Sequence, residues 1–318
     1  MSITRILIAD PLDAGGVAIL RREGFDVDVQ TGLSEEQLLP ILPEYTAMIV
    51  RSGTQVTERM IGSMEHMKFI ARAGVGVDNI DVAAATRKSI LVMNAPNANT
   101  VSTAEHTLAM IFSLARHIPF AHAELRQGTW NRKKWMGIQL EGKTLGVIGF
   151  GKIGSEVAKK ANAIGMRVVA YDPLVASEFI VSRNAEPAAL PALLSSSDII
   201  TVHVPLTNVT RGLLGEKEFS LCKRGVLIIN CARGGIVDET HLYEAIEKGI
   251  VAGAALDVFA EEPPAKDNPL LHDSRVIVTP HIGSATIEAQ MLVAIQIAEQ
   301  LADALHGRRL AGIVNTPA

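Results

Sequence analysis

The sequence lacks the features that mark several classes of protein. Its two cysteines, Cys222 and Cys231, form no C-x-x-C pair, and no H-E-x-x-H motif occurs. We therefore expect a reduced, cytoplasmic protein without a metal site. No uninterrupted apolar run approaches the ~18 residues of a membrane span, and the N-terminus lacks the long apolar core of a signal peptide. The formal net charge of -4 offers no basic field for nucleic acid or for a membrane surface.

What the chain does contain indicates an α/β protein. It has 318 residues, of which 48% are hydrophobic and 20% charged, enough for a large interior and suggestive of two domains. Short runs rich in Val and Ile alternate with helical patterns, and most of these runs lack polar alternation, as expected for parallel strands buried on both faces. The predicted strands are residues 3–9, 47–50, 69–71, 90–93, 145–149, 167–171, 199–202, 226–229, 252–256 and 276–278.

Two loops predict the domain boundaries. The first is "NAPNANTVSTAEH", residues 94–106, where Ser102 and Glu105 fit a capping box that opens a helix through about residue 116. The second is "TPHIGSAT", residues 279–286, after which a last helix should return to the first domain. The predicted organisation is a discontinuous domain, 1–98 plus 288–318, around a continuous domain, 99–287.

A glycine-rich stretch predicts a dinucleotide site. Gly149, Gly151 and Gly154 form G-x-G-x-x-G between an apolar strand and an amphipathic helix. They permit, in turn, a tight turn, close approach of a pyrophosphate, and close packing of helix on strand. Asp172 ends the next strand and would bind ribose hydroxyls and repel a 2′-phosphate, which favours NAD over NADP. The alternative is a tight turn without a cofactor, and Lys152 could either approach phosphate or remain solvated.

An arginine, a glutamate pair and a histidine follow three predicted strands. Arg233 ends one strand and is followed by two glycines, Glu261 and Glu262 lie in "FAEEPP" after the next strand, and His281 follows "VTP". Ligands in open parallel sheets sit beyond the carboxyl ends of strands. This set suits hydride exchange between a 2-hydroxy acid and a nicotinamide.

Each group has a chemical task in that reaction. The arginine fork matches a carboxylate, and the histidine can give or take the hydroxyl proton. A nearby carboxylate should raise the histidine pKa and fix its tautomer, and the two glycines should leave room for substrate. Each residue also has an ordinary alternative, namely a structural ion pair, an unremarkable histidine, or an acidic surface turn.

These stretches resemble the D-isomer-specific 2-hydroxyacid dehydrogenases over nearly the whole chain. The motifs concerned are "GFGKIG", "YDP", "VHVPLT", "NCARGGIVDE", "ALDVF..EEPP" and "PHIGSAT". The resemblance implies a Rossmann-type doubly wound domain inserted in a flavodoxin-like substrate domain. It also implies Arg233 as substrate clamp, Glu262 as histidine partner and His281 as proton donor. Glu262 is chosen over Glu261 because the family's glutamate immediately precedes the proline.

The resemblance also implies the cofactor site and the oligomeric state. The expected NAD contacts are Gly149, Gly151, Lys152, Ile153, Gly154, Asp172, Val204, Cys231, Ala232, Asp257, Gly283 and Ser284. Relatives often carry threonine at the positions of Val75 and Val204, which leaves hydrogen bonds there open. Family members are usually dimers built by their nucleotide domains, so a homodimer is expected.

The first domain contains candidates for substrate recognition. In "RAGVGVDN", the backbone of Gly74, Val75 and Gly76 could form an anion-binding nest for a carboxylate, or simply a glycine turn. Arg51 and Arg72 end first-domain strands, and we hypothesise that they bind a phosphate. "RSGTQVT", "RAGVGVDNIDVAAATRKSILVMNAPN" and "WNRKKWMG" are most similar to the family branch that oxidises 3-phospho-D-glycerate to 3-phosphooxypyruvate in serine biosynthesis.

Alternative functions remain open from the sequence. Short relatives reduce hydroxypyruvate or glyoxylate, with NAD or NADP, or oxidise sulfolactate-type acids, and a sulfonate would satisfy the same arginines. NAD-sensing corepressor-like proteins keep the arginine, glutamate and histidine as well. The basic cluster at 132–134 could reach a neighbouring active site or form a solvated loop beside a dimer contact. The chain ends soon after its last helix, so a C-terminal regulatory domain is not expected.

Overall fold

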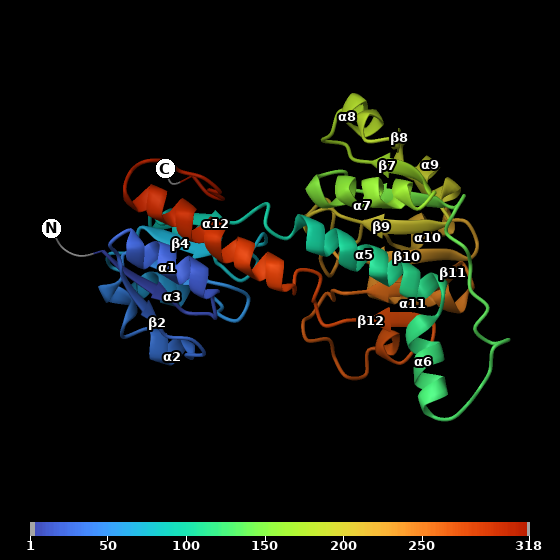
Figure 1. Cartoon of the computed structure of the whole chain (residues 1–318), viewed down its shortest axis with the longest axis horizontal. Helices are drawn as coiled ribbons and strands as arrows, with labels where there is room; N and C mark the ends of the chain where they lie inside the picture. Colours follow the sequence, from blue (N-terminus) through green and yellow to red (C-terminus); the bar gives the residue numbers. More distant parts are fainter. Residues whose placement is uncertain (1–3, 317–318) are drawn as a thin grey trace. The chain divides into compact units, whose positions relative to one another are not determined.

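The computed structural model describes residues 4–316, and the chain divides into two compact units. The first runs to Asn99 and resumes at Ala285, and the second spans Thr100–Ser284 (Figure 1). Within residues 4–316, no helix is both long and apolar enough to cross a bilayer.

The first unit is built on a five-stranded sheet with the order β2-β1-β3-β4-β5. All of its strand pairs are parallel, and this order is that of flavodoxin-like folds. The strands are β1 (Arg5–Ile8), β2 (Asp26–Val29), β3 (Ala47–Val50), β4 (Phe69–Arg72) and β5 (Leu91–Asn94). The helices are α1 (Ala14–Arg22), α2 (Glu35–Leu38), η1 (Leu42–Glu44), α3 (Glu58–Ser63), α4 (Val82–Arg87) and α12 (Ile287–Leu305).

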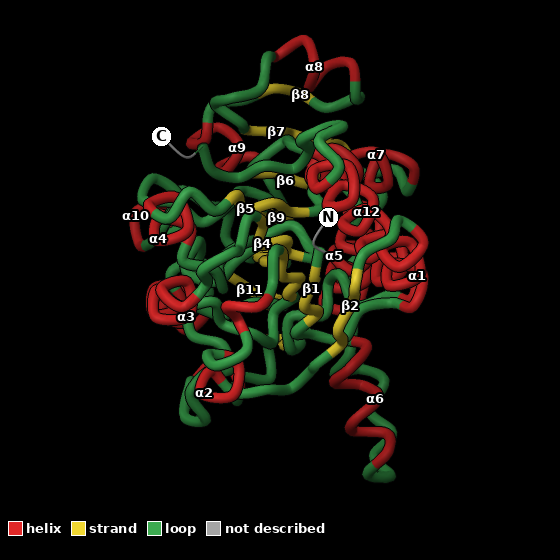
Figure 2. The backbone as a smooth tube through the Cα atoms, turned by 90° about the vertical axis from the view of Figure 1, so that its left-hand side faces the viewer, coloured by secondary structure: helices red, strands yellow, loops and turns green. Residues whose placement is uncertain are grey.

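Helices cover both faces of this sheet. Figure 2 shows α1 and α12 on one side and α3 and α4 on the other, each side with its own apolar cluster. Helix α12 starts at Thr286, whose hydroxyl accepts from the Ala289 amide, as expected for an N-cap. It packs so closely on α1 that a Cβ added to Gly16 would lie 2.6 Å from the Ala294 carbonyl oxygen. Helix α12 thus belongs to the apolar layer of the first unit on the α1 side.

The second unit contains a seven-stranded parallel sheet with the order β12-β11-β10-β9-β6-β7-β8. Its central part has the doubly wound nucleotide-binding order, which confirms the predicted fold class. The strands are β6 (Thr144–Ile148), β7 (Arg167–Tyr171), β8 (Glu186–Pro187), β9 (Ile199–Val202), β10 (Val226–Asn230), β11 (Val251–Leu256) and β12 (Val276–Val278). The helices are α5 (Thr100–Ala115), α6 (Ile118–Arg126), α7 (Lys152–Ala163), α8 (Ser177–Ser182), α9 (Leu190–Ser196), α10 (Glu216–Ser220), α11 (Glu239–Glu247) and η2 (Pro269–Leu271).

The structure differs from the predicted elements at the start of one helix and at two strands. Helix α5 begins at Thr100, so Ser102 and Glu105 lie inside the helix and do not cap it. Strands β2 and β8 escaped prediction because neither is a continuous apolar run, and β8 has only two residues. In β2 the sequence "DVDV" alternates, which a search for uniformly apolar strands overlooks. Residue 3 of the first predicted strand lies outside the described residues.

Helix α12 offers a matched test of the first unit's core. Ile297 is fully buried in the cluster on the α1 side, whereas Ile287 on the same helix is 86% exposed. We expect Ile297→Ala to lower the free energy of unfolding by about 2–5 kcal/mol through lost burial and cavity formation. Ile287→Ala should change it by no more than about 0.5 kcal/mol. Urea unfolding measures both values. Equal losses of stability in the two variants would contradict the burial of Ile297 in this core.

Candidate active site

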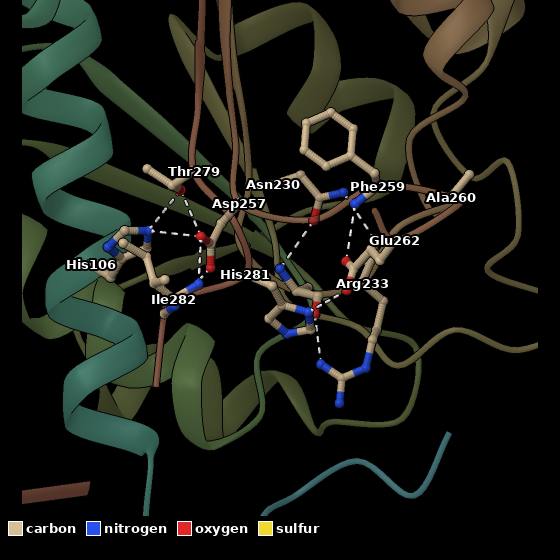
Figure 3. A network of polar contacts seen from close by, with 12 residues as sticks. His106, Asn230, Arg233, Asp257, Phe259, Ala260, Glu262, Thr279, His281 and Ile282 are labelled. Atoms are coloured by element: carbon tan, nitrogen blue, oxygen red, sulfur yellow. Dashed lines mark hydrogen bonds and ion pairs between the residues drawn. The ribbon is translucent and has the colours of Figure 1, made fainter. Parts of the chain in front are cut away.

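Three adjacent strands of the second unit place Arg233, Glu262 and His281 in one region. Strands β10, β11 and β12 are neighbours and pair in parallel, so their carboxyl ends meet at one edge of the sheet. Arg233 follows β10, Glu262 follows β11 and His281 follows β12. Figure 3 shows the three side chains gathered at this edge.

The side chains of Glu262 and His281 are joined by a hydrogen bond. The His281 Nδ1 atom lies 2.7 Å from Oε2 of Glu262, while Oε1 of Glu262 accepts from the Phe259 amide at 3.2 Å. Burial acts to raise the pKa of Glu262, but the hydrogen bond and charge of His281, the Phe259 amide and the charge of Arg233 together hold that pKa below its usual value. Glu262 is thus ionised at neutral pH, and its contact with Nδ1 leaves Nε2 of His281 as the nitrogen available for proton transfer.

The turn after β10 orients Arg233. The buried Asn230 side chain donates to the Arg233 carbonyl at 2.9 Å and accepts from the Ala232 amide at 3.0 Å. The Arg233 guanidinium donates through Nη1 to the Ala232 carbonyl at 2.7 Å. Figure 3 shows this cation beside the hydrogen-bonded Glu262–His281 pair.

The glycines after Arg233 serve the protein's own packing. A Cβ added to Gly234 would lie 1.7 Å from the Phe259 carbonyl oxygen, and Gly235 has a φ of 77°. The sequence pattern predicted that both glycines leave room for substrate and nicotinamide. At position 234 the backbone that follows β11 comes too close for any side chain, which is enough to require glycine. Gly235 adopts a left-handed backbone conformation that favours glycine.

A buried carboxylate anchors the loop that carries His281. Both oxygens of Asp257 are used, because Oδ1 accepts from the Ile282 amide at 2.8 Å and Oδ2 from the Gly283 amide at 2.7 Å. The amide of His281 donates to the Asp257 carbonyl at 2.8 Å. These bonds support His281 in a left-handed backbone conformation, with a φ of 53°, which is unusual for a residue with a side chain.

The glycine-rich loop has the form that a dinucleotide requires. Gly149 has a φ of 91°, and a Cβ added to Gly154 would lie 2.0 Å from the Gly149 carbonyl oxygen, so helix α7 is packed tightly on the loop. Among residues 4–316, apart from Gly151 and its chain neighbours, no atom lies within 4 Å of a Cβ added to Gly151, so the space before the N-terminus of α7 is open to a ligand. Asp172 is fixed at the end of β7 because its carboxylate accepts from the Phe150 and Leu174 amides at 2.8 and 2.9 Å.

The other predicted cofactor residues lie in the second unit with different surroundings. Lys152 is the exposed first residue of α7, Ile153 packs partly into the core, and Val204 contacts the Gly149 turn. Burial, with a contribution from the Asp257 charge, raises the pKa of the Cys231 thiol to about 12, so this buried cysteine is neutral at pH 7. Ala232 and Ser284 are half-buried at the ends of the turns that follow β10 and β12.

The predicted substrate residues belong to the first unit. Arg51 and Arg72 lie at the carboxyl ends of the paired strands β3 and β4. The buried Asp10 carboxylate accepts from the Arg51 amide at 2.6 Å and so fixes the start of its loop. The Arg72 guanidinium lies against Gly74, where an added Cβ would be 1.3 Å from Nη1. The Val75 carbonyl accepts from Asn94 at 2.6 Å, and Gly76 continues this turn.

The segment that contains the basic cluster is partly anchored within its own unit. Trp135 packs near Phe120 on α6 and near His117, which precedes that helix, and it hydrogen-bonds to Glu124. Arg132 and Lys133 are exposed, and Trp130 is 76% exposed. Trp135 is thus packed within its own unit, whereas Trp130 is largely exposed.

Sequence reasoning overlooked several polar residues that shape the site. Asn230 holds the Arg233 turn, and His106 and Thr279 both contact Asp257. His106 and Thr279 are 173 positions apart, so no local pattern could have paired them. Among residues 4–316 no group of three or more His, Cys, Asp or Glu side chains is arranged to hold a metal ion.

Comparison with known proteins identifies the family. Residues 108–283 match the family described as D-isomer specific 2-hydroxyacid dehydrogenase, NAD binding domain. The chain belongs to this family. It is 49% identical over 313 residues to D-3-phosphoglycerate dehydrogenase of Archaeoglobus fulgidus, a match that covers 98% of this chain but 59% of that protein. The chain thus spans about three-fifths of the length of this relative.

Solved structures agree over almost the whole chain. The TT0316 protein from Thermus thermophilus has a TM-score of 0.87 at 33% identity, and the match covers 98% of this chain and 100% of that one. D-lactate dehydrogenase from Aquifex aeolicus, complexed with NAD and lactic acid, has a TM-score of 0.83 at 29% identity, covering 96% of each chain. The second unit carries the NAD-binding domain of the family.

Proposed function

We propose that the protein oxidises 3-phospho-D-glycerate to 3-phosphooxypyruvate with NAD as the hydride acceptor. The observation that carries this proposal is the hydrogen-bonded Glu262–His281 pair beside Arg233 on an NAD-binding domain of the 2-hydroxyacid dehydrogenase family. The phosphorylated substrate is favoured because the relative from Archaeoglobus fulgidus is a D-3-phosphoglycerate dehydrogenase.

The roles of the three residues follow from their chemistry. Arg233 pairs with the substrate carboxylate and orients the hydroxyl-bearing carbon. In oxidation, Nε2 of His281 accepts the hydroxyl proton, and the ionised Glu262 stabilises the imidazolium that forms. In reduction, His281 returns that proton to the carbonyl oxygen. NAD, when bound, supplies the acceptor for the hydride.

The cofactor would be held by groups already fixed by the fold. The amides at the start of α7 and the open space at Gly151 suit a pyrophosphate, and Lys152 adds a nearby cation. Asp172 suits the ribose hydroxyls and disfavours a 2′-phosphate. Val204, Cys231, Ala232, Asp257, Gly283 and Ser284 are proposed to line the nicotinamide end.

Turnover on a panel of acids tests the function. The panel contains 3-phosphoglycerate, a sulfonated hydroxy acid, glycerate and lactate for oxidation, and hydroxypyruvate and glyoxylate for reduction, each with NAD and NADP. We expect the highest kcat/KM with 3-phosphoglycerate and NAD. A better rate with an unphosphorylated acid would assign another dehydrogenase activity. No turnover with any acid, together with tight NAD binding, would favour a NAD-sensing corepressor-like protein.

Substitutions at the hydrogen-bonded Glu262–His281 pair test the proposed chemistry. His281→Asn should lower kcat by about 10²–10⁴-fold, as expected for loss of a general base. Glu262→Gln removes the charge that stabilises the imidazolium, so the rise of oxidation rate with pH should move to lower pH and kcat should fall. Glu261→Gln is the matched control and should retain the parental pH profile. If Glu261→Gln shifted the profile and Glu262→Gln did not, the assignment of the histidine partner would be wrong.

We propose that the first unit recognises the substrate's anionic groups. Arg51 and Arg72 are offered as phosphate ligands, and the turn at Gly74, Val75 and Gly76 as a nest for the carboxylate. Two observations support these roles. The two arginines lie at the ends of paired strands, and the Arg72 side chain packs closely on Gly74.

A double substitution separates phosphate recognition from general damage. Arg51→Gln with Arg72→Gln should lower kcat/KM for 3-phosphoglycerate by about 100-fold, since two charge-assisted contacts are lost. The loss on glycerate should stay below about tenfold. Arg59→Gln, an exposed arginine paired with Glu35 and Glu36, is the control. Equal losses on both acids would exclude a phosphate-binding role for the arginine pair.

We also propose that the protein forms a homodimer through its NAD-binding unit. Ile118, Leu125, Trp130 and Met136 expose 52–81% of their surface along α6 and the segment that follows. Such a concentration of exposed apolar residues is typical of an interface.

Sedimentation equilibrium tests the dimer. Trp130→Ser with Met136→Ser should weaken dimerisation by at least about tenfold, because buried aromatic residues dominate interface energies. Leu174→Ser, at a position of the same unit that is 93% exposed, should leave the dimer unchanged. A monomeric parent protein at micromolar concentration would contradict the proposal.

A further inference from the structure

A second histidine lies behind the candidate active site. Nε2 of His106, on α5, is 3.3 Å from Oδ1 of Asp257 and 3.3 Å from the hydroxyl oxygen of Thr279. The Thr279 hydroxyl in turn donates to the same Oδ1 atom at 2.6 Å. Figure 3 shows His106 and Thr279 grouped around Asp257, to the left of the His281 imidazole.

The geometry fixes the hydrogen on His106. Asp257 can only accept, and the Thr279 hydroxyl hydrogen is already directed at Asp257. Both oxygens that face Nε2 are therefore acceptors, so Nε2 carries a hydrogen and shares it between them. His106 donates to the carboxylate whether the imidazole is neutral or charged.

Asp257 depends on these donors because it is buried. Its side chain is 1% exposed, and burial acts to raise its pKa. The hydrogen bonds from His106, Thr279 and Ile282, with the charge of His106, outweigh burial and keep the pKa of Asp257 below its usual value. An ionised Asp257 is the form that accepts from the Ile282 and Gly283 amides on either side of its carboxylate.

The loop has little room to move away from this network. A Cβ added to Gly283 would lie 3.1 Å from Oδ2 of Asp257, 3.6 Å from Thr103 and 3.7 Å from the His106 ring. The loop backbone is thus pressed against both the carboxylate and helix α5. A change in the position of Asp257 is transmitted to the residue before Ile282, which is His281.

We propose that His106 is a positioning residue, whose Nε2–H holds the Asp257 carboxylate in the orientation that anchors residues 279–283 and thereby aims the imidazole of His281. The catalytic consequence rests on the proposed function, but the structural consequence does not. Thr279 acts in the same network as the second donor, and neither residue needs to touch substrate.

Two substitutions at residue 106 separate hydrogen bonding from packing. His106→Leu keeps similar bulk but removes the donor, and His106→Gln keeps an N–H at similar reach. In the protein without substrate, hydrogen exchange of the Ile282 and Gly283 amides should quicken about tenfold in His106→Leu, equivalent to about 1.4 kcal/mol. In His106→Gln it should stay within about threefold of the parent.

Turnover provides the second measurement. In His106→Leu, kcat for 3-phosphoglycerate should fall about tenfold while KM changes less than about threefold, because Arg233 belongs to a different strand and keeps its place. His106→Gln should recover most of kcat. If the parent protein turned over no hydroxy acid, the proposed function would fail, and the exchange measurement would still decide the positioning role.

Two substitutions at Thr279 provide an independent test in case the His106 variants fail to fold. Thr279→Val is isosteric and lacks the hydroxyl, whereas Thr279→Ser keeps it, so only Thr279→Val should quicken exchange at Ile282 and Gly283. The proposal is overturned if His106→Leu leaves exchange and kcat at parental values. It is also overturned if His106→Leu and His106→Gln are equally impaired, since the donor would then be irrelevant.

Discussion

The parallel pairing of β10, β11 and β12 brings three carboxyl ends to one edge of a sheet, and every group of the candidate active site depends on it. Each strand end supplies one ionisable side chain, and the buried strands hold the intervening backbone rigid. A cation, an anion and an imidazole that lie far apart in sequence are thus adjacent in space. Their mutual stabilisation offsets the cost of partly removing charges from water.

A layer of polar side chains beneath this edge supports the charged groups. The Asn230 side chain holds the turn at Arg233 through two hydrogen bonds, and the Asp257 carboxylate holds the loop that contains His281 in the same way. Both are buried, so their hydrogen-bonding capacity has to be met by the protein itself. This requirement links the chemistry of the site to helix α5 through His106, although α5 carries none of the three proposed catalytic residues.

Much of the fold was predictable because its strands are buried on both faces. Runs such as 47–50, 167–171 and 199–202 have the observed bounds, and the glycine-rich loop lies between β6 and α7 as expected. Strands β2 and β8 were missed because neither contains a continuous apolar run: β2 alternates polar and apolar residues, and β8 has only two residues. The capping pattern at Ser102 misled because local hydrogen-bonding signatures also occur inside helices.

The sequence by itself determined the α/β class, the dinucleotide motif and the three residues proposed for catalysis, since these depend on local apolar runs and on motifs of adjacent residues. Only the tertiary structure decided what lies beneath them. Gly234 is required by the backbone near Phe259, and His106 contacts Asp257 across a long stretch of chain. Such contacts arise from the packing of separate elements, and no spacing along the chain encodes a distance between side chains that meet only when the sheet and α5 have assembled.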